Sequence, residues 1–158
     1  MKDIMVVNLA DVKATHKNEH QAYEYYKKPL VPAREGHQCC IAAYEIPPGK
    51  CAYPYHYHTM NEEAFYILSG TGMLTTPQGD RAVSQGDFLF FPTGEQGAHL
   101  LRNTSDTERL VYLDFDTLNP IDVSFYPQTG KIGIWGRNTN RVFRISDEVD
   151  YYEGETQQ

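Results

Sequence analysis

From residue 38 to residue 115 the chain is a regular succession of short segments rich in Tyr, Phe, Val, Ile and Leu. Turn-forming residues such as Pro47-Pro48-Gly49 interrupt them roughly every eight to twelve residues, which is too often for helices. The segments predict about eight strands, over residues 39–46, 51–58, 63–70, 71–77, 81–87, 88–92, 98–103 and 109–115. Short strands at this spacing favour an all-β sandwich or jelly-roll barrel.

The 158 residues predict one domain with two extensions. Residues 1–36 form the predicted N-terminal arm, in which the polar stretch 13–28 is either a short helix ending before Pro29 or an extended arm across a partner subunit. The barrel core is predicted over 37–117. Residues 118–158 form a C-terminal extension whose further strands are expected on the outside of the barrel or at a dimer interface.

Two histidines lie two residues apart, at His56 and His58, in an aromatic stretch that favours a strand. Residues two apart share a face of a strand but not of a helix, so both imidazoles can converge on one ion. Glu63 follows at an odd offset, and therefore a turn at residues 59–61 must bring it to the same side. In this register Glu62 faces outward, and it is the alternative carboxylate ligand.

A third imidazole is available after a second strand-turn-strand stretch. The apolar strand 88–91 leads into a turn at Pro92-Thr93-Gly94, and His99 opens the following strand. Glu95 and Gln96, on the loop before His99, are either solvated or reach the mouth of the barrel. Inside the barrel an apolar cavity is expected, lined by Phe65, Phe88 and Phe90.

The spacing Gly49-x6-His56-x-His58-x4-Glu63-x6-Gly70, followed by Gly86-x5-Pro92-x-Gly94-x4-His99-x3-Asn103, resembles the paired motifs of the cupin superfamily. The chain departs from that pattern by one extra residue between Gly49 and His56 and by a longer turn between Gly94 and His99. The resemblance covers residues 37–135 and is strongest to small single-domain bacterial cupins without an agreed activity. It implies a double-stranded β-helix, a metal site of His56, His58, Glu63 and His99, and a homodimer.

Three imidazoles and one carboxylate suit a borderline divalent ion, so iron, manganese, nickel and zinc are all candidates. Four protein ligands leave positions open for water or a small-molecule ligand, which is the basis for expecting chemistry. Two functions follow. The first is a metal-dependent enzyme acting on a small oxygenated molecule, as a dioxygenase, isomerase or decarboxylase; the second is a non-catalytic module that binds or senses a sugar or carboxylate. Tyr44, Tyr53, Tyr55 and Tyr112 are candidate proton donors, but no spacing singles one out.

Charge and hydropathy exclude several other classes. The formal net charge of −7 would repel a phosphate backbone, so nucleic acid is not an expected partner. No apolar run is long enough for a membrane span, and no signal-peptide pattern opens the chain, which predicts a cytoplasmic protein. The cysteines, two of them adjacent, do not predict a disulfide framework.

Overall fold

The computed structural model describes residues 4–33, 36–136 and 138–156, and strands make up almost all of its regular structure. Three short 3-10 turns cover Leu9–Asp11, Glu95–Gly97 and Ile145–Asp147. The strands are β1 (Thr15–His20), β2 (Tyr23–Val31), β3 (Cys39–Ile46), β4 (Tyr57–His58), β5 (Glu63–Ser69), β6 (Thr71–Thr76), β7 (Gly79–Ser84), β8 (Phe88–Phe91), β9 (Leu100–Asn103), β10 (Leu110–Thr117), β11 (Ile121–Tyr126), β12 (Lys131–Gly136) and β13 (Thr139–Arg144). The all-β prediction is confirmed.

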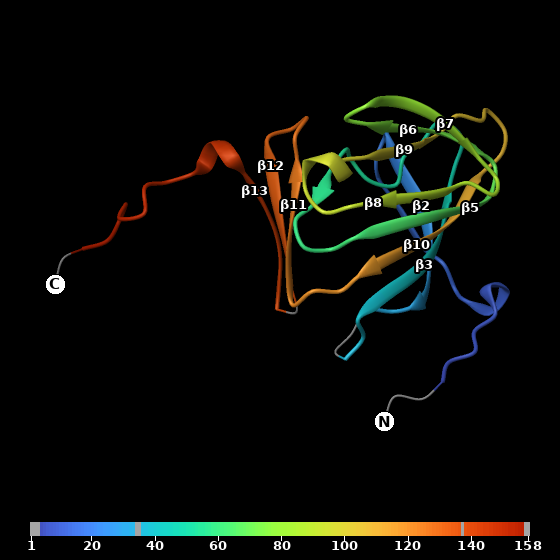
Figure 1. The fold of residues 1–158 in the computed structure, drawn as a ribbon, viewed down its shortest axis with the longest axis horizontal. Helices are drawn as coiled ribbons and strands as arrows, with labels where there is room; N and C mark the ends of the chain where they lie inside the picture. Colours follow the sequence, from blue (N-terminus) through green and yellow to red (C-terminus); the bar gives the residue numbers. More distant parts are fainter. Residues whose placement is uncertain (1–3, 34–35, 137, 157–158) are drawn as a thin grey trace.

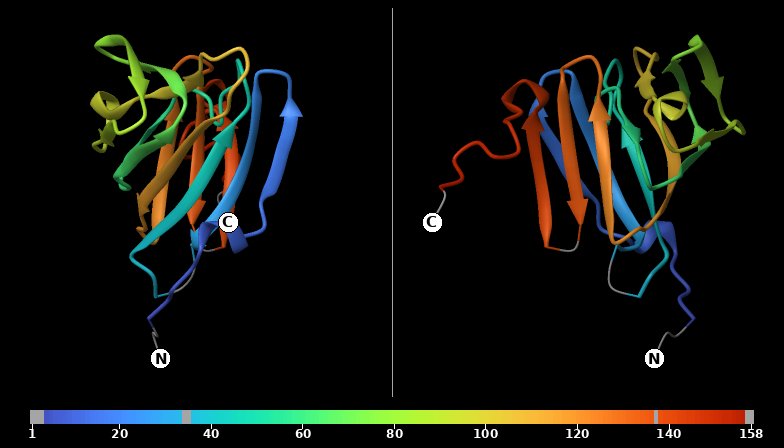
Figure 2. Two further views of the ribbon diagram at one scale, coloured as in Figure 1. Left: turned by 90° about the vertical axis from the view of Figure 1, so that its right-hand side faces the viewer. Right: turned by 60° about the vertical axis from the view of Figure 1, so that its left-hand side comes forward.

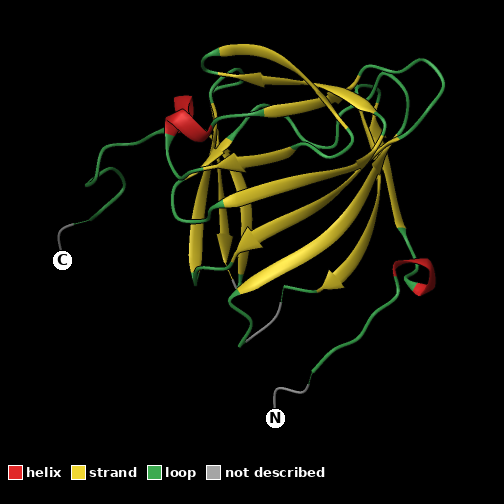
Figure 3. Cartoon of the chain, turned by 45° about the vertical axis from the view of Figure 1, so that its right-hand side comes forward, coloured by secondary structure: helices red, strands yellow, loops and turns green. Residues whose placement is uncertain are grey.

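The strands form three antiparallel sheets that enclose a barrel (Figures 1 and 3). The largest has the order β1-β2-β3-β10-β5-β8, the second β13-β12-β11-β4, and the third β7-β6-β9. The left view of Figure 2 shows the second sheet lying behind the first, and in both views the described chain ends lead away from the barrel. The sheet neighbours are far apart in sequence, as in β3-β10-β5, which is the jelly-roll arrangement expected from the strand spacing.

The predicted barrel strands agree with the structure to within a few residues, except that the segment 51–58 contributes only the two-residue strand β4. The N-terminal arm differs more. The helix alternative for residues 13–28 is wrong, because β1 and β2 form a hairpin there that extends the first sheet through β3. The ring of Tyr25 packs against that of Tyr44 with centroids 5.5 Å apart, which fixes β2 on the barrel.

The core lies between the sheets and is built from alternate residues of the central strands. Tyr44 and Tyr112 stack with centroids 5.2 Å apart, and Phe65 lies 4.5 Å from Tyr112. Each large apolar side chain of this kind contributes about 1.5–3 kcal/mol when fully buried. Asn103 donates its amide to the carbonyls of Ile46 and Glu108, both at 2.8 Å.

The C-terminal strands complete the second sheet. β11 pairs with β4 in the register Ser124↔His58, so residues after Thr117 lie directly beside a predicted metal ligand.

The boundaries of the three predicted segments stay predictions. The three cysteines are free. Within the described residues, none of the helical turns has the length or hydropathy to cross a membrane.

Candidate metal centre

The four predicted ligands come from two adjoining stretches of backbone inside the barrel. His56 and His99 form an antiparallel bridge, with His56 N to His99 O at 3.1 Å and His99 N to His56 O at 2.9 Å. His58 lies in β4, and Glu63 begins β5. Three of the side chains are almost fully buried, since His56, Glu63 and His99 are 8%, 5% and 2% exposed.

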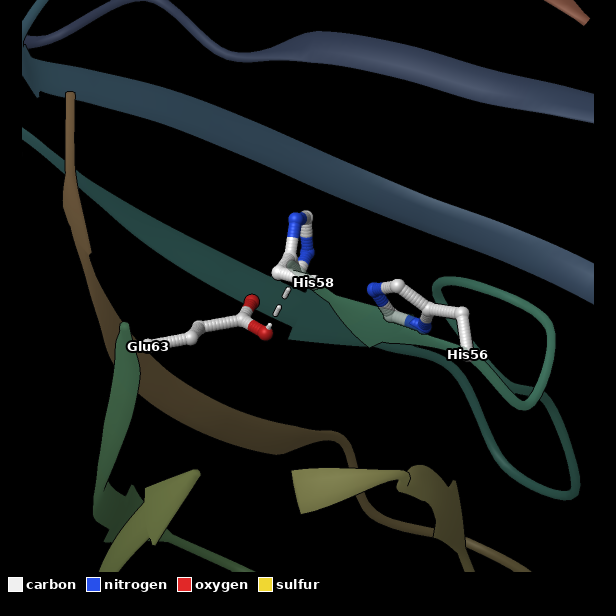
Figure 4. Close-up of side chains that lie close together, drawn as sticks. All are labelled: His56, His58 and Glu63. Carbon is white, nitrogen blue, oxygen red and sulfur yellow. Dashed lines mark ion pairs between the residues drawn. The ribbon is translucent and has the colours of Figure 1, made fainter. Parts of the chain in front are cut away.

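His56, His58 and Glu63 form a compact group that could hold a metal ion, because one ligand atom from each lies within 4.8 Å of the other two. Figure 4 shows the two imidazoles and the carboxylate gathered at the end of β4, with the ion pair from His58 Nε2 to Glu63 Oε2 at 3.9 Å. His99 approaches the same carboxylate, and its Nε2 lies 3.0 Å from Glu63 Oε2.

The hydrogen bonds of the imidazoles aim one nitrogen of each at this group. Nδ1 of His56 donates to the carbonyl of Pro54 at 2.8 Å, and Nδ1 of His99 donates to the carbonyl of Gly97 at 2.9 Å. A carbonyl can only accept, so Nδ1 carries the proton in both rings. Nε2 of each neutral ring then presents a lone pair, which is the arrangement that orients a metal-binding histidine.

The ligand atoms of this group are satisfied better by a bound cation than by hydrogen bonds within the protein. Glu63 Oε2 and His99 Nε2 are buried atoms without a hydrogen-bond partner among the described residues, although they face each other. When His99 is neutral, both atoms are acceptors, and a buried acceptor left unpaired costs about 1–3 kcal/mol. A positive ion between them satisfies both, so the residues present are suited to a bound metal.

The register of β5 decides which glutamate belongs to the site. Glu63 is buried beside the imidazoles, whereas Glu62 is exposed and its backbone N–H donates to Thr117 Oγ1 at 2.8 Å. The alternation continues through Phe65 and Ile67, which are also buried. The predicted inward face of Glu63 and outward face of Glu62 are therefore confirmed.

The electrostatics keep Glu63 ionised and His56 neutral. Burial opposes ionisation of Glu63, but the neighbouring imidazoles, led by His99, outweigh it and hold the pKa of Glu63 at about 2. Burial, followed by repulsion from His99, lowers the pKa of His56 to about 4. Anionic carboxylate and neutral imidazole are the forms that bind metal ions.

His58 is oriented by residues that sequence reasoning missed, all from the C-terminal extension. Its Nδ1 lies 2.5 Å from Asp122 Oδ2 and 3.1 Å from Ser124 Oγ. Trp135 Nε1 donates to the same Ser124 oxygen at 2.7 Å. Burial lowers the pKa of His58, but the hydrogen bond to Asp122 and the nearby carboxylates outweigh it, so the pKa of His58 is raised overall. No local spacing marks these residues, because β11 meets β4 only in the folded sheet.

Asp122→Asn is expected to lower the affinity for divalent metal by about 10–100-fold, the usual effect of losing a partner of a metal-binding histidine. Asp122 Oδ1 accepts from the backbone N–H groups of Met60 and Asn61 at 2.8 and 3.2 Å, while Oδ2 accepts from His58. An amide NH₂ in either position faces another donor. Metal titration against a chelator measures the effect, with the exposed Asp80→Asn as control; equal affinities for the two variants would contradict the role of Asp122.

His99 is aimed by a tight turn over residues 95–97. Gly97 supplies the carbonyl that holds His99 Nδ1, and a Cβ on Gly97 would overlap the carbonyl oxygen of Pro92. The ring of His99 also stacks on Phe91, with centroids 3.6 Å apart. The turn, longer than in the cupin pattern, thus still directs His99 toward Glu63.

Gly97→Ala is expected to destabilise the protein by about 1–3 kcal/mol or more, because the new methyl group forces the backbone of the turn apart. The same shift should weaken metal binding by moving His99. Gln96→Ala, at the exposed neighbouring position, should stay within about 0.5 kcal/mol of the parent. Thermal unfolding of the metal-free proteins tests this, and a parental melting temperature for Gly97→Ala would show that the turn relaxes freely.

His56, His58 and Glu63 line a cavity of about 270 Å³. Tyr44 and Tyr53 line it and share a hydrogen bond of 2.9 Å between their hydroxyls. The other lining residues are mainly polar or aromatic: Lys27, Asn61, Asp114, Asp116, Leu118, Asp122, Ser124, Tyr126 and Trp135. Glu95 and Gln96 line a different, outer pocket.

The expectation that Phe88 and Phe90 line the barrel cavity is wrong. They are 63% and 54% exposed, because the alternation of β8 turns Leu89 and Phe91 inward instead. Phe91 pairs with Glu63 across the sheet, and that pairing fixes the phase. Phe65 is buried as expected and packs edge-on against His99, with ring centroids 5.5 Å apart.

Two carboxyl groups of β10, Asp114 and Asp116, complete the wall of the cavity. Burial and the charge of Glu63 raise the pKa of Asp114 well above its usual value and that of Asp116 to about 6. A signal for them exists in the sequence. Leu110 and Tyr112 are the inward residues of an alternating strand, so the aspartates at the next two alternate positions must also face inward.

An antiparallel barrel with a buried histidine–glutamate group in its interior defines the class, that of the double-stranded β-helix proteins. Residues 42–116 match the Cupin_2 family, described as a cupin domain. This match shows that the chain carries a cupin domain. No curated protein matches the chain significantly.

Several solved structures share the fold. A protein of Acidithiobacillus ferrooxidans ATCC 23270, named a "putative sugar phosphate isomerase", is 29% identical over 89% of this chain and 90% of its own, with a TM-score of 0.76. A sugar phosphate isomerase from a cupin superfamily of Silicibacter pomeroyi DSS-3 is 17% identical over 94% and 98%, with a TM-score of 0.79. A "predicted oxalate decarboxylase" of Thermotoga maritima is 26% identical over 73% and 100%, with a TM-score of 0.64.

Proposed function

We propose that the protein binds one divalent metal ion through His56, His58, Glu63 and His99, and that it is a metal-dependent enzyme acting on a small oxygenated molecule. The observation that carries the proposal is the buried, mutually facing pair of acceptors, His99 Nε2 and Glu63 Oε2, beside two further imidazoles. When bound, an ion such as iron, manganese, nickel or zinc would supply Lewis-acid polarisation of a substrate oxygen.

The residues around the cavity have separate tasks in this proposal. The imidazoles and Glu63 position the ion, and Asp122 with Ser124 keeps His58 in place. Asp114 and Asp116 line the same cavity and offer carboxyl groups that can accept or donate a proton at a substrate hydroxyl. These groups support an isomerase or decarboxylase type of reaction, in which proton movement accompanies the change at carbon.

A non-catalytic sugar- or carboxylate-binding module is the second candidate. The aromatic rings of Tyr126 and Trp135, which line the cavity, favour it, since flat apolar surfaces beside polar groups suit a sugar ring. The same metal group would then hold the ligand without turnover.

A single experiment separates the two functions. The protein is loaded in turn with iron, manganese, nickel or zinc and incubated with a panel of diols, sugars, hydroxy-ketones and keto-acids. We expect product, detected by mass spectrometry, with at least one combination and none with His58→Ala. A rise in melting temperature without product would instead favour the binding module. Neither product nor a thermal shift with any combination would contradict both functions.

We further propose that the protein is a homodimer. β13 is the edge of its sheet, and its Val142 and Phe143 are large apolar side chains that the described residues leave exposed. An exposed edge strand of this kind is a ready site for pairing with a second copy. Sedimentation analysis should give twice the mass of the chain, and a monomer at micromolar concentration would refute the proposal.

A further inference from the structure

We propose that the barrel holds a second cation site, formed by Glu63, Asp114 and Asp116 and suited to a hard divalent ion such as Mn²⁺. One carboxylate oxygen from each of these residues lies within 4.8 Å of the other two. The inference extends the proposed metal centre, with which it shares Glu63. Its other two ligands, Asp114 and Asp116, do not belong to the group formed with the imidazoles.

The sheet register places the three carboxylates together. Asp116 is the direct cross-strand neighbour of Glu63, and Asp114 follows at the next inward position of β10. Neighbouring carboxylates inside a barrel repel each other unless protons or cations lie among them. The short distances between these carboxylates are therefore stable only if a proton or a cation lies among them.

The protein supplies only part of that charge. Lys27 is the single lysine or arginine among the residues lining the cavity, and its Nζ lies over the ring of Tyr44, 5.0 Å from the centroid. The thiol of Cys40 donates to Asp116 Oδ2 at 3.3 Å. With an ion bound, three ionised carboxylates and the ammonium of Lys27 together carry two negative charges, which is the charge that one divalent ion neutralises.

An unpartnered buried oxygen points to the ligand. Asp114 is 4% exposed, and its Oδ1 has no hydrogen-bond partner among the described residues. Glu63 Oε2 is likewise a buried oxygen without a hydrogen-bond partner among the described residues. A buried carboxylate oxygen without a donor carries a large desolvation cost, and coordination to an ion removes it.

The ligand chemistry separates this site from the imidazole group. An oxygen-only set suits Mg²⁺, Ca²⁺ or Mn²⁺, whereas a set with three imidazoles binds zinc, iron or nickel more tightly than manganese. Glu63, which belongs to both groups, would join the two sites, as a carboxylate does in two-ion centres. The second ion would also cancel the negative charge of the cavity and so admit an anionic small molecule.

The test loads the protein with one equivalent of Zn²⁺ and then titrates Mn²⁺, with free Mn²⁺ measured by electron paramagnetic resonance. We expect one equivalent of bound Mn²⁺ while Zn²⁺ is retained. Asp114→Asn should weaken Mn²⁺ binding by at least about 10-fold and leave the Zn²⁺ equivalent in place. The exposed Glu62→Gln is the matched control and should bind both ions as the parent does.

Three outcomes would overturn the inference: no Mn²⁺ bound by the Zn²⁺-loaded parent, displacement of Zn²⁺ by Mn²⁺, or unchanged Mn²⁺ binding by Asp114→Asn. Asp116→Asn serves as the second variant, with Zn²⁺ retention and circular dichroism as checks on folding. Failure of the Zn²⁺ step itself would instead contradict the proposed imidazole centre. In that case His58→Ala, which keeps all three carboxylates, still tests the Mn²⁺ site by direct titration.

Discussion

Glu63→Gln is expected to lower the affinity for divalent metal by more than about 100-fold, beyond the effect of losing a partner of a ligand. The variant removes the anionic ligand that His58 and His99 face at 3.9 and 3.0 Å. Metal content after dialysis and competition with a chelator measure the change. Glu62→Gln, one residue earlier and exposed, should bind metal as the parent does.

The metal-free Glu63→Gln protein should remain folded, because the amide NH₂ of glutamine can donate to the lone pair of His99 Nε2. We therefore expect an unchanged or raised melting temperature in the absence of metal, together with loss of the extra stability that metal gives the parent. Loss of metal from Glu62→Gln as great as that from Glu63→Gln would contradict the β5 register as the basis of the site.

Metal affinity should fall as the pH is lowered, by about tenfold per pH unit for each imidazole that must release a proton. His58 comes first. Its pKa is raised above the usual 6.5 by Asp122, with Glu63 and Asp116 also facing it, so the competing proton is already bound below about pH 6.5. The affinity contributed by His58 is thus fully present above its raised pKa and is lost below it.

His56 should compete with protons only near pH 4, because burial and His99 lower its pKa to about 4. Glu63, with a pKa of about 2, stays ionised over the whole range. We expect a slope of at least one proton below about pH 6.5 that steepens further toward pH 4. Chelator competition at a series of pH values measures it, and the onset should move to lower pH in Asp122→Asn. A metal affinity independent of pH across this range would exclude imidazole ligation.

Most barrel strands could be predicted because their signals are local. The burial of β5 and β10 alternates along the strand, and glycine and proline mark the turns. β1 and β2 lack such a signal: every residue of β1 is exposed, and β2 is half-buried almost throughout. Edge strands without an inward face give no period to recognise, so a helix was an equally good hypothesis there.

That the residues of a strand alternate between two faces is easier to predict than which of the two faces points into the barrel. The four residues of β8 are all apolar, so the sequence offered no choice between Phe88 with Phe90 and Leu89 with Phe91 as the inward pair. Phe91 faces inward because it pairs with the buried Glu63 on the neighbouring strand. In β10, by contrast, two acidic residues continue an apolar face, and their inward direction could have been predicted from Leu110 and Tyr112.

The donors themselves, His56, His58 and Glu63, were determined by the sequence, because their convergence depends on one short strand and one turn. Which groups surround them was decided by the tertiary structure alone. Asp122 and Ser124 reach His58 only because β11 pairs with β4, and Asp116 reaches Glu63 only because β10 lies between β3 and β5. Pairings between such distant segments depend on how the whole barrel closes, and no local pattern of residues encodes them.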